Sequence, residues 1–454
     1  MTVLMSALPQ GKPEMVEDGK RKLYQFQQPI PIPSYLIAIA AGNLEARKIG
    51  PRSHVWSEPE VVDAAASKLD DTEDLLKIAE ELSGPYIWGI YDILVLPPSF
   101  AYSGMENPCL TFISPHILQG EKAHVKLMAH EIAHSWTGNL VTNKNFEHFW
   151  INEGFTMFVG RRIQGLVSGG RAMESLEALG DWKQLENYVN EVVTDDHPLT
   201  SLVVNLTGLN PHDSFNPIPY HKGSVFLWYL EGIVGGPAIM ETFLKSYYKS
   251  FAYKSIDSTE FKGYFENYFK NETKINSIDW DTWLNGRGMP LYRPNYDESL
   301  SQACKDLAQK WINLDTDVSA DLTTSNREWT ILSPEQKREF MSVLLAEKEP
   351  LSVEKLQLMD ELYQLNSMKH WEIRSRWIRL GLKGHWDHAI PRAVEMVSEG
   401  GDIIMTIGPI YRDMYDWEKA REAALEAFEN NRSSMMKVAV HSVMKDLKIS
   451  ESES

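Results

Sequence analysis

One segment constrains the fold of this 454-residue chain more than any other: the run VKLMAHEIAHSWTGNLV, from Val125 to Val141. On an α-helix, residues four apart lie on one face, so His130 and His134 can converge on one metal ion. Glu131 follows the first histidine and points into the same cleft. The spacing therefore predicts a helix with two zinc ligands, although a histidine pair also occurs on ordinary solvated or core helix faces.

A third ligand is needed, because zinc in hydrolytic sites usually has three protein ligands and leaves a fourth position to water. Glu153 in FWINEGF completes the pattern HExxH-x18-E. This spacing lets the chain leave the first helix, turn at Gly138-Asn139 and return on a second helix that faces the first. We therefore predict one zinc ion held by His130, His134 and Glu153. Glu131 would then be the general base for a water of lowered pKa.

Composition narrows the class of protein. A chain of this length with 43% hydrophobic residues can bury more than one core, so two or more domains are expected. Asp and Glu number 63 against 45 Lys and Arg, and the net charge of -18 disfavours nucleic acid or an anionic membrane as partner. Cys109 and Cys304 are too few for a disulfide framework. With no recognisable signal peptide or membrane-spanning run, we expect a cytoplasmic protein.

The pattern along the chain divides it into three parts. Residues 22–44 have short apolar runs broken by Pro and Gly, which indicate strands and turns. Helical periodicity over 58–82 is followed by two strand-like runs, and from Glu121 onward the pattern is mostly helical. Glycines and prolines clustered after Trp283 indicate a domain boundary. Beyond it, amphipathic segments predict paired helices stacked as a solenoid, with an irregular helical domain as the alternative.

These motifs resemble a known family. HEIAHSWTGNLVT, WINEGF and GMENP resemble the gluzincin aminopeptidases, and SYLIAIAAGNL, VLPPSFAYSGMENPCLTF and TNKNFEHFW resemble the leukotriene A-4 hydrolase branch. The resemblance implies an α+β fold: a thermolysin-like zinc peptidase domain over 45–288, then an all-α, HEAT/armadillo-like solenoid over 289–454. Residues 1–44 would be the remnant of an N-terminal β domain. The implied substrates are peptides with a free N-terminus.

The resemblance also assigns substrate-binding residues. Glu106 matches the glutamate of the GxMEN motif, which binds the substrate α-amine, although the first glycine of that motif is Ser103 here. Without the family, this segment would be a turn with a solvated carboxylate. The backbone of Gly104 and Met105 would lie along the extended substrate, since a small residue allows close approach. Tyr102 resembles a residue that lines the first specificity pocket.

Tyr220 is the second catalytic residue that the resemblance implies. A tetrahedral intermediate needs a hydrogen-bond donor for its oxyanion. In the family a tyrosine within a PYxKG-like sequence supplies it, and IPYHKGS places Tyr220 there. The alternative is an aromatic residue packed in the first turn of a helix.

Several positions depart from the leukotriene A-4 hydrolase pattern. His212 stands where the family has Asp, with Asp213 adjacent, and Phe215 stands where it has a second Tyr. Asp402 and Ile404 align with an Arg and a Lys that bind a carboxylate in the family. These changes make epoxide hydrolysis doubtful and favour basic or neutral peptides if Asp402 faces the cleft.

A further departure concerns the support of the metal ligands. Gly160 replaces a glutamate about two helical turns after NEGF, which predicts weaker zinc affinity. We therefore predict a zinc metallo-aminopeptidase. The alternatives are a leukotriene A-4 type epoxide hydrolase and a catalytically weak, zinc-stabilised protein that binds peptides or partners.

Overall fold

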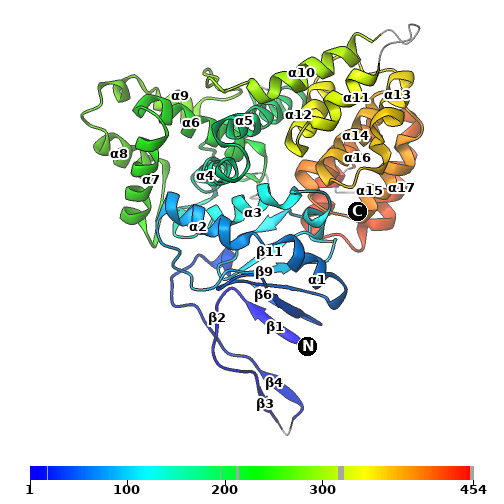
Figure 1. The fold of residues 1–454 in the computed structure, drawn as a ribbon. Helices are drawn as coiled ribbons and strands as arrows, with labels where there is room; N and C mark the ends of the chain where they lie inside the picture. The colour runs from blue at the N-terminus through cyan, green and yellow to red at the C-terminus, as the bar shows by residue number, and fades with distance from the viewer. Residues whose placement is uncertain (18, 195, 211–213, 315–321, 450–454) are drawn as a thin grey trace.

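The computed structural model describes residues 1–17, 19–194, 196–210, 214–314 and 322–449. Figure 1 shows strands at the base of the molecule, a mixed region above them and a bundle of helices on one side that contains the C-terminal part of the chain. The mixed region and the helical bundle meet along one face. The candidate site lies between them.

The central sheet is built from five strands in the order β10-β11-β9-β8-β7. Its inner strands β8, β9 and β11 are parallel, whereas β7 and β10 pair antiparallel at the two edges. The strands are β7 (Glu45–Lys48), β8 (His54–Ser57), β9 (Asp92–Val95), β10 (Gly104–Met105) and β11 (Leu110–Ile113). Strand β10 therefore has one hydrogen-bonding edge that no strand of this sheet covers.

The two faces of the sheet are buried by different elements. Side chains alternate along a strand, so Ile93 lies in the large core beneath the helices while Leu94 lies on the opposite face. There Leu94 and Leu110 pack with Leu4 of the N-terminal segment. That segment contains β1 (Thr2–Met5), β2 (Leu8–Pro9), β3 (Glu14–Val16), β4 (Arg21–Leu23), β5 (Phe26–Gln27) and β6 (Ile39–Gly42), which pair as β1-β6, β2-β5 and β3-β4.

Nine helices lie in the middle of the described chain, and the first three of them pack near the other face of the sheet. They are α1 (Pro59–Lys68), α2 (Thr72–Ser83), α3 (Ala123–Ala133), α4 (Trp150–Ser168), α5 (Gly170–Asn187), α6 (Gly223–Val234), α7 (Pro237–Phe251), α8 (Ser258–Tyr268) and α9 (Trp280–Asn285). A short parallel pair, β12 (Val141–Asn143) and β13 (Lys254–Ile256), joins the segment after α3 to the one after α7.

The helical periodicity over 58–82 corresponds to two helices. Helix α1 ends before Leu69, and the Thr72 hydroxyl donates to the Leu69 carbonyl at 2.7 Å. This local side-chain bond closes the break between α1 and α2.

Helix α4 is held on three sides by a buried ion network. Arg162 contacts Glu174 of α5 at 2.9 Å and Glu231 of α6 at 2.6 Å. The same guanidinium contacts Glu241 of α7 at 2.6 Å. A guanidinium with three carboxylate partners fixes the position of α4 relative to its neighbours.

The C-terminal part of the chain is all-helical. Helices α10, α12, α14, α16 and α18 pack in sequence as one row, while α11 packs on α13 and α15 on α17 in a second row. Their bounds are α10 (Ser299–Ile312), α11 (Leu322–Ile331), α12 (Pro334–Leu345), α13 (Val353–Tyr363), α14 (Trp371–Lys383), α15 (Ala389–Glu399), α16 (Gly408–Asp416), α17 (Glu418–Arg432) and α18 (Lys437–Asp446). The structure is thus mostly helical, and the domain limits at 44 and 288 stay predictions.

Among the described residues, no single helix has the length and apolar composition needed to cross a bilayer. One bent pair, Ile218–Val234 with Pro237–Phe251, meets that test by length and composition, with an angle of 114° between its two halves.

Candidate active site

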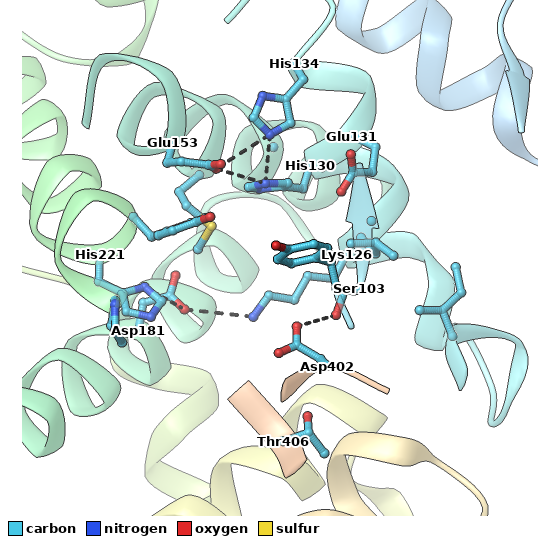
Figure 2. Close-up of a pocket in the computed structure, with 18 of the residues that line it drawn as sticks. Ser103, Lys126, His130, Glu131, His134, Glu153, Asp181, His221, Asp402 and Thr406 are labelled. Carbon is cyan, nitrogen blue, oxygen red and sulfur yellow. Dashed lines mark hydrogen bonds and ion pairs between the residues drawn. The ribbon is translucent and has the colours of Figure 1, made fainter. Parts of the chain in front are cut away.

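The three predicted zinc ligands converge at the place where α3 faces α4. His130 lies in the last turn of α3, His134 immediately follows that helix, and Glu153 lies in the first turn of α4. The Oε2 atom of Glu153 is 3.3 Å from His130 Nε2 and 3.6 Å from His134 Nε2. The two Nε2 atoms are 3.1 Å apart, and Figure 2 shows all three groups directed at one point.

Hydrogen bonds fix the orientation of the His134 ring. Its Nδ1 atom lies 3.0 Å from the carbonyl of Thr137, which can only accept, so Nδ1 carries the proton. The hydroxyl of Thr156, one turn after Glu153, lies 3.1 Å from the same nitrogen. The Nε2 lone pair of His134 is therefore free to bind a metal. In metal sites, a hydrogen bond at the other ring nitrogen fixes the histidine ring in this way.

The chemistry of this donor set fits zinc. One ligand atom each from His130, His134 and Glu153 lies within 4.8 Å of the others, and imidazole nitrogen with carboxylate oxygen is a usual zinc combination. Glu153 Oε2 is buried and has no hydrogen-bond partner. Burial lowers the pKa of His130 to about 4 and raises the pKa of Glu153 to about 7. A neutral imidazole is the form that binds a metal, and a divalent cation would favour the ionised carboxylate.

Two further carboxylates lie beside these ligands. Glu131 and Glu106 each have an oxygen within 4.8 Å of the other and of a His134 ring nitrogen. Both side chains are buried, with 4% and 8% of their surface exposed. Burial, followed by the charges of Glu106 and Glu153, raises the pKa of Glu131 well above its usual range. Glu131 can thus hold a proton more readily than an exposed glutamate does.

The GMEN segment forms the free edge of the central sheet. Gly104 and Met105 constitute β10, and the Asn139 side chain fixes the next residue by donating to the Glu106 carbonyl at 2.8 Å. A β-carbon placed on Gly104 would lie 2.1 Å from Glu131 Oε1. Glycine at this position therefore allows the carboxylate of Glu131 to lie directly against the strand edge.

Tyr220 lies beside the metal ligands, in the π-helix η7 (Ile218–Lys222). Its ring is nearly parallel to that of His130, with centroids 6.4 Å apart. Burial and then the Glu153 charge raise the pKa of its hydroxyl, so the group keeps its proton and can donate a hydrogen bond. The π-helix η7 is positioned by the close contact between α4 and α6. A β-carbon on Gly154 of α4 would lie 2.8 Å from the Cα atom of Gly223, the first residue of α6.

The three metal ligands, both further carboxylates, β10 and Tyr220 line one cavity of about 400 Å³. Tyr102 also lines the cavity, and the centroid of its ring lies 5.7 Å from that of the Phe100 ring. The structure thus brings every predicted site residue to one cavity. Residues that sequence reasoning did not assign to the site also line it: Tyr35, Lys126, Phe146, Phe149, Asp181, His221, His370, Trp371, Glu372, Arg376 and Thr406.

Two of these additions illustrate what the motifs did not reveal. Tyr35 comes from the N-terminal segment and accepts a hydrogen bond from Asn152, the residue before Glu153, at 3.3 Å. Trp371 comes from the first turn of α14 in the C-terminal helices. Trp371 lies in no recognisable motif. Tyr35 lies in the stretch SYLIA, which carries the family resemblance but assigns no residue to the site.

The departures from the family pattern are distributed around the cavity. Asp402 and Phe215 line it, and the Ser103 hydroxyl donates to Asp402 Oδ2 at 2.7 Å. Gly160 lies under His130, where an added β-carbon would be 3.2 Å from His130 Cα. The close packing of α3 on α4 uses this glycine. His212, Asp213 and the side chain of Ile404 lie outside the described residues.

The fold and site together define a class of protein. A sheet with a free edge strand, an HExxH helix and a following helix with the third ligand constitute a thermolysin-like zinc peptidase domain. A C-terminal helical domain closes one side of its cleft.

Comparisons with known proteins assign the family. Residues 67–283 match the peptidase family M1 domain, and residues 332–447 match the leukotriene A4 hydrolase C-terminal domain. Leukotriene A-4 hydrolase of Xenopus laevis is 46% identical over 454 residues, which is 100% of this chain and 73% of that protein. Leucine aminopeptidase 2 of Neurospora crassa is 37% identical over 447 residues, 97% of this chain and 65% of that protein.

A solved structure agrees with these matches. Yeast leukotriene A4 hydrolase in complex with bestatin superimposes with a TM-score of 0.90 at 30% identity, covering 99% of this chain and 72% of that one. The chain belongs to the M1 peptidase family, in its leukotriene A-4 hydrolase branch. It is a hydrolase, a zinc metallopeptidase of the aminopeptidase type, and the predicted resemblance is confirmed.

Proposed function

We propose that this chain removes single residues from the N-termini of peptides, with one zinc ion held by His130, His134 and Glu153. The observation that carries the proposal is the convergence of these three ligand atoms within 4.8 Å beside the buried Glu131. When bound, the ion would supply Lewis acidity toward the peptide carbonyl and lower the pKa of a water molecule.

Glu131 is the general base in this proposal. Its raised pKa suits a group that accepts a proton from the attacking water and then delivers it to the leaving amine. Its position against Gly104 supports this role, because a substrate along β10 would pass directly over the carboxylate. The nitrogen of the broken peptide bond thus receives its proton without a second acid.

Recognition of the substrate N-terminus is assigned to Glu106. A buried carboxylate at the end of an edge strand can form a charge-assisted hydrogen bond with an α-ammonium group. The free edge of Gly104 and Met105 would pair with the substrate main chain as an added strand. Tyr102 would then contact the first side chain, and the carbonyl next to the bound amine would be the one attacked.

Tyr220 is the hydrogen-bond donor for the oxyanion that develops at this carbonyl. Its protonated hydroxyl lines the same cavity as the strand edge and lies beside Glu153. A donor that is fixed before the reaction stabilises developing charge without reorganisation. The cavity of about 400 Å³ suits a short peptide rather than a folded chain end.

Epoxide hydrolysis of leukotriene A-4 is the alternative activity. The 46% identity to the Xenopus laevis leukotriene A-4 hydrolase favours it. The anionic Asp402 on the cavity wall disfavours an anionic lipid substrate. Incubation with leukotriene A-4 and detection of the dihydroxy product tests this activity separately from peptide hydrolysis.

The proposal also includes the architecture of the C-terminal helices, the nature of the N-terminal segment and the cellular location. The two rows of C-terminal helices support a HEAT/armadillo-like solenoid. The strand pairs within residues 1–44 support a β-structured segment before the catalytic domain. A cytoplasmic location is supported by Cys109 and Cys304, which are free and buried.

The test compares wild type with Glu131→Gln in zinc content and in hydrolysis of aminoacyl chromogenic amides. We expect both proteins to bind about one zinc ion per chain, with activity in the variant reduced at least about 100-fold. The exposed Glu422→Gln in α17 is the matched control and should retain wild-type activity. Zinc binding without activity in either protein would instead support the catalytically weak, peptide-binding alternative.

A further inference from the structure

A hydrogen bond joins the C-terminal helices to the strand that carries the substrate-binding edge. Asp402 Oδ2 accepts from the Ser103 hydroxyl at 2.7 Å across 299 residues of sequence, as Figure 2 shows. The main chain supports this contact, because the Ile403 N–H donates to the Ala101 carbonyl at 3.1 Å. Gly400 packs closely too, since a β-carbon there would lie 2.4 Å from the Pro98 carbonyl oxygen. The Asp402 carboxylate is therefore held at a defined point of the cavity wall.

The direction of β10 determines which part of a substrate meets this point. Glu106 follows the strand and Ser103 precedes it, so the two residues lie at opposite ends of β10. A peptide whose amine is bound at Glu106 must extend back past Met105 and Gly104 toward Ser103. Three residues of extended chain span roughly 10 Å, which brings the second or third residue of the peptide beside Asp402.

The cations that line the cavity already have carboxylate neighbours. Lys126 Nζ lies 2.9 Å from Glu177, and Arg161 lies 3.5 Å from Asp181.

The third cation lies at the helical side of the cavity. Arg376 is 3.8 Å from Glu372, which also contacts Arg338 at 2.6 Å. Lys126, Arg161 and Arg376 are the only Lys or Arg side chains among the described residues that line the cavity. Their charges therefore lie beside other acids, and Asp402 adds negative charge to the wall near Ser103.

We infer that Asp402 is a specificity-determining residue that favours peptides with lysine or arginine at the second or third position. This inference rests on the proposed aminopeptidase function and names its substrate class. A cationic side chain would lie beside the carboxylate, whereas a glutamate or a free C-terminal carboxylate at that place would meet a like charge. Peptide amides and longer peptides are therefore better substrates than free tripeptides.

Asp402→Asn separates the charge from the hydrogen bond, because the asparagine carbonyl can still accept from Ser103. The assay uses tetrapeptide amides with N-terminal alanine and with lysine, alanine or glutamate at the second or third position. In wild type we expect kcat/KM to decrease in the order lysine, alanine, glutamate. In Asp402→Asn the lysine-to-glutamate ratio should fall roughly tenfold.

Two controls separate the charge from other effects. Ser103→Ala removes the hydroxyl but keeps the charge, so lysine should remain preferred. Asp387→Asn changes an exposed carboxylate of the same helical region that pairs with Lys419, and the wild-type ratio should persist.

The possible failures are distinguishable. Cleavage of all the amides with an unchanged ratio in Asp402→Asn, or with glutamate preferred by wild type, overturns the inference and leaves the aminopeptidase proposal intact. If no amide is cleaved, the proposed function fails, and equilibrium binding of the same amides to the zinc-loaded chain takes over as the readout. An equal lysine-to-glutamate affinity ratio in wild type and Asp402→Asn then overturns the inference.

Discussion

The side-chain amine of Lys222 donates a hydrogen bond to the main-chain carbonyl of Gly286 at 2.8 Å. It also donates to the carbonyls of Thr200 and Gly288, each at 2.9 Å. Burial lowers the pKa of this amine to about 8, so at neutral pH it still carries the protons that it donates. Two residues after Tyr220, Lys222 thus ties the π-helix of the site to the loop that leaves the catalytic region.

Replacing Lys222 with methionine should destabilise the fold. The substitution keeps the apolar stem and leaves three carbonyls without their donor, which we expect to cost about 2–4 kcal/mol of unfolding free energy. Urea unfolding followed by tryptophan fluorescence measures the loss. Lys245→Met, at an exposed position of α7, should remain within about 0.5 kcal/mol of wild type, and an equal effect of both substitutions would contradict this account.

Gly104→Ala should abolish activity while preserving the fold. The added methyl would overlap Glu131 Oε1, which is the end of a side chain and can rotate away at little structural cost. The base would then leave its position, and we expect kcat/KM to fall at least about 100-fold with an almost unchanged melting temperature. Gly263→Ala, where a β-carbon meets no atom within 4 Å, should keep full activity. An active Gly104→Ala enzyme would show that Glu131 does not need this contact.

Tyr220→Phe should lower kcat with little change in KM or zinc content. The substitution removes only the hydroxyl that faces the developing oxyanion, and loss of one such donor costs roughly 100–1000-fold in kcat. Tyr248→Phe removes another buried hydroxyl, one with no hydrogen-bond partner, and serves as the control. Similar kinetics for the two variants would assign Tyr220 to packing, the alternative that its sequence context left open.

The zinc site could be predicted from sequence because its parts are close together in the chain. His130, His134 and Glu153 span 24 residues, and the helix–turn–helix between them follows from the 3.6-residue period and from Gly138. The general base is adjacent to the first ligand. Local periodicity was therefore sufficient to bring four of the site residues together.

The rest of the cavity could not be predicted in this way, because it depends on packing between distant elements. The Ser103–Asp402 bond spans 299 residues, and no periodic pattern encodes which helix end meets which strand. Thr137 and Thr156 orient the His134 ring, yet each is an ordinary helix or turn residue in the sequence. The helical pattern over 58–82 does not locate the break between α1 and α2, which the Thr72 hydroxyl closes.

His116 lies where the catalytic region meets the C-terminal helices. It is 4% exposed, its Nδ1 lies 2.7 Å from the Ser114 hydroxyl, and its ring centroid is 4.0 Å from that of Trp371. The charges of Glu399 and Arg374 face it from the helical side. Burial lowers the pKa of His116 from 6.5 to about 4.

This shift predicts acid sensitivity at the contact between the two regions. Below about pH 6.5 the unfolded chain binds a proton that the folded chain binds only near pH 4, so stability decreases as the pH falls through that window. The decrease from His116 approaches about 1.4 kcal/mol per pH unit. His116→Gln, which can still bond Ser114, should therefore give a shallower decline of the urea midpoint between about pH 6.5 and about pH 5. His388→Gln, at an exposed position, controls for the substitution itself and should keep the wild-type slope. Equal slopes in His116→Gln and wild type would mean that His116 is protonated alike in the folded and unfolded chains.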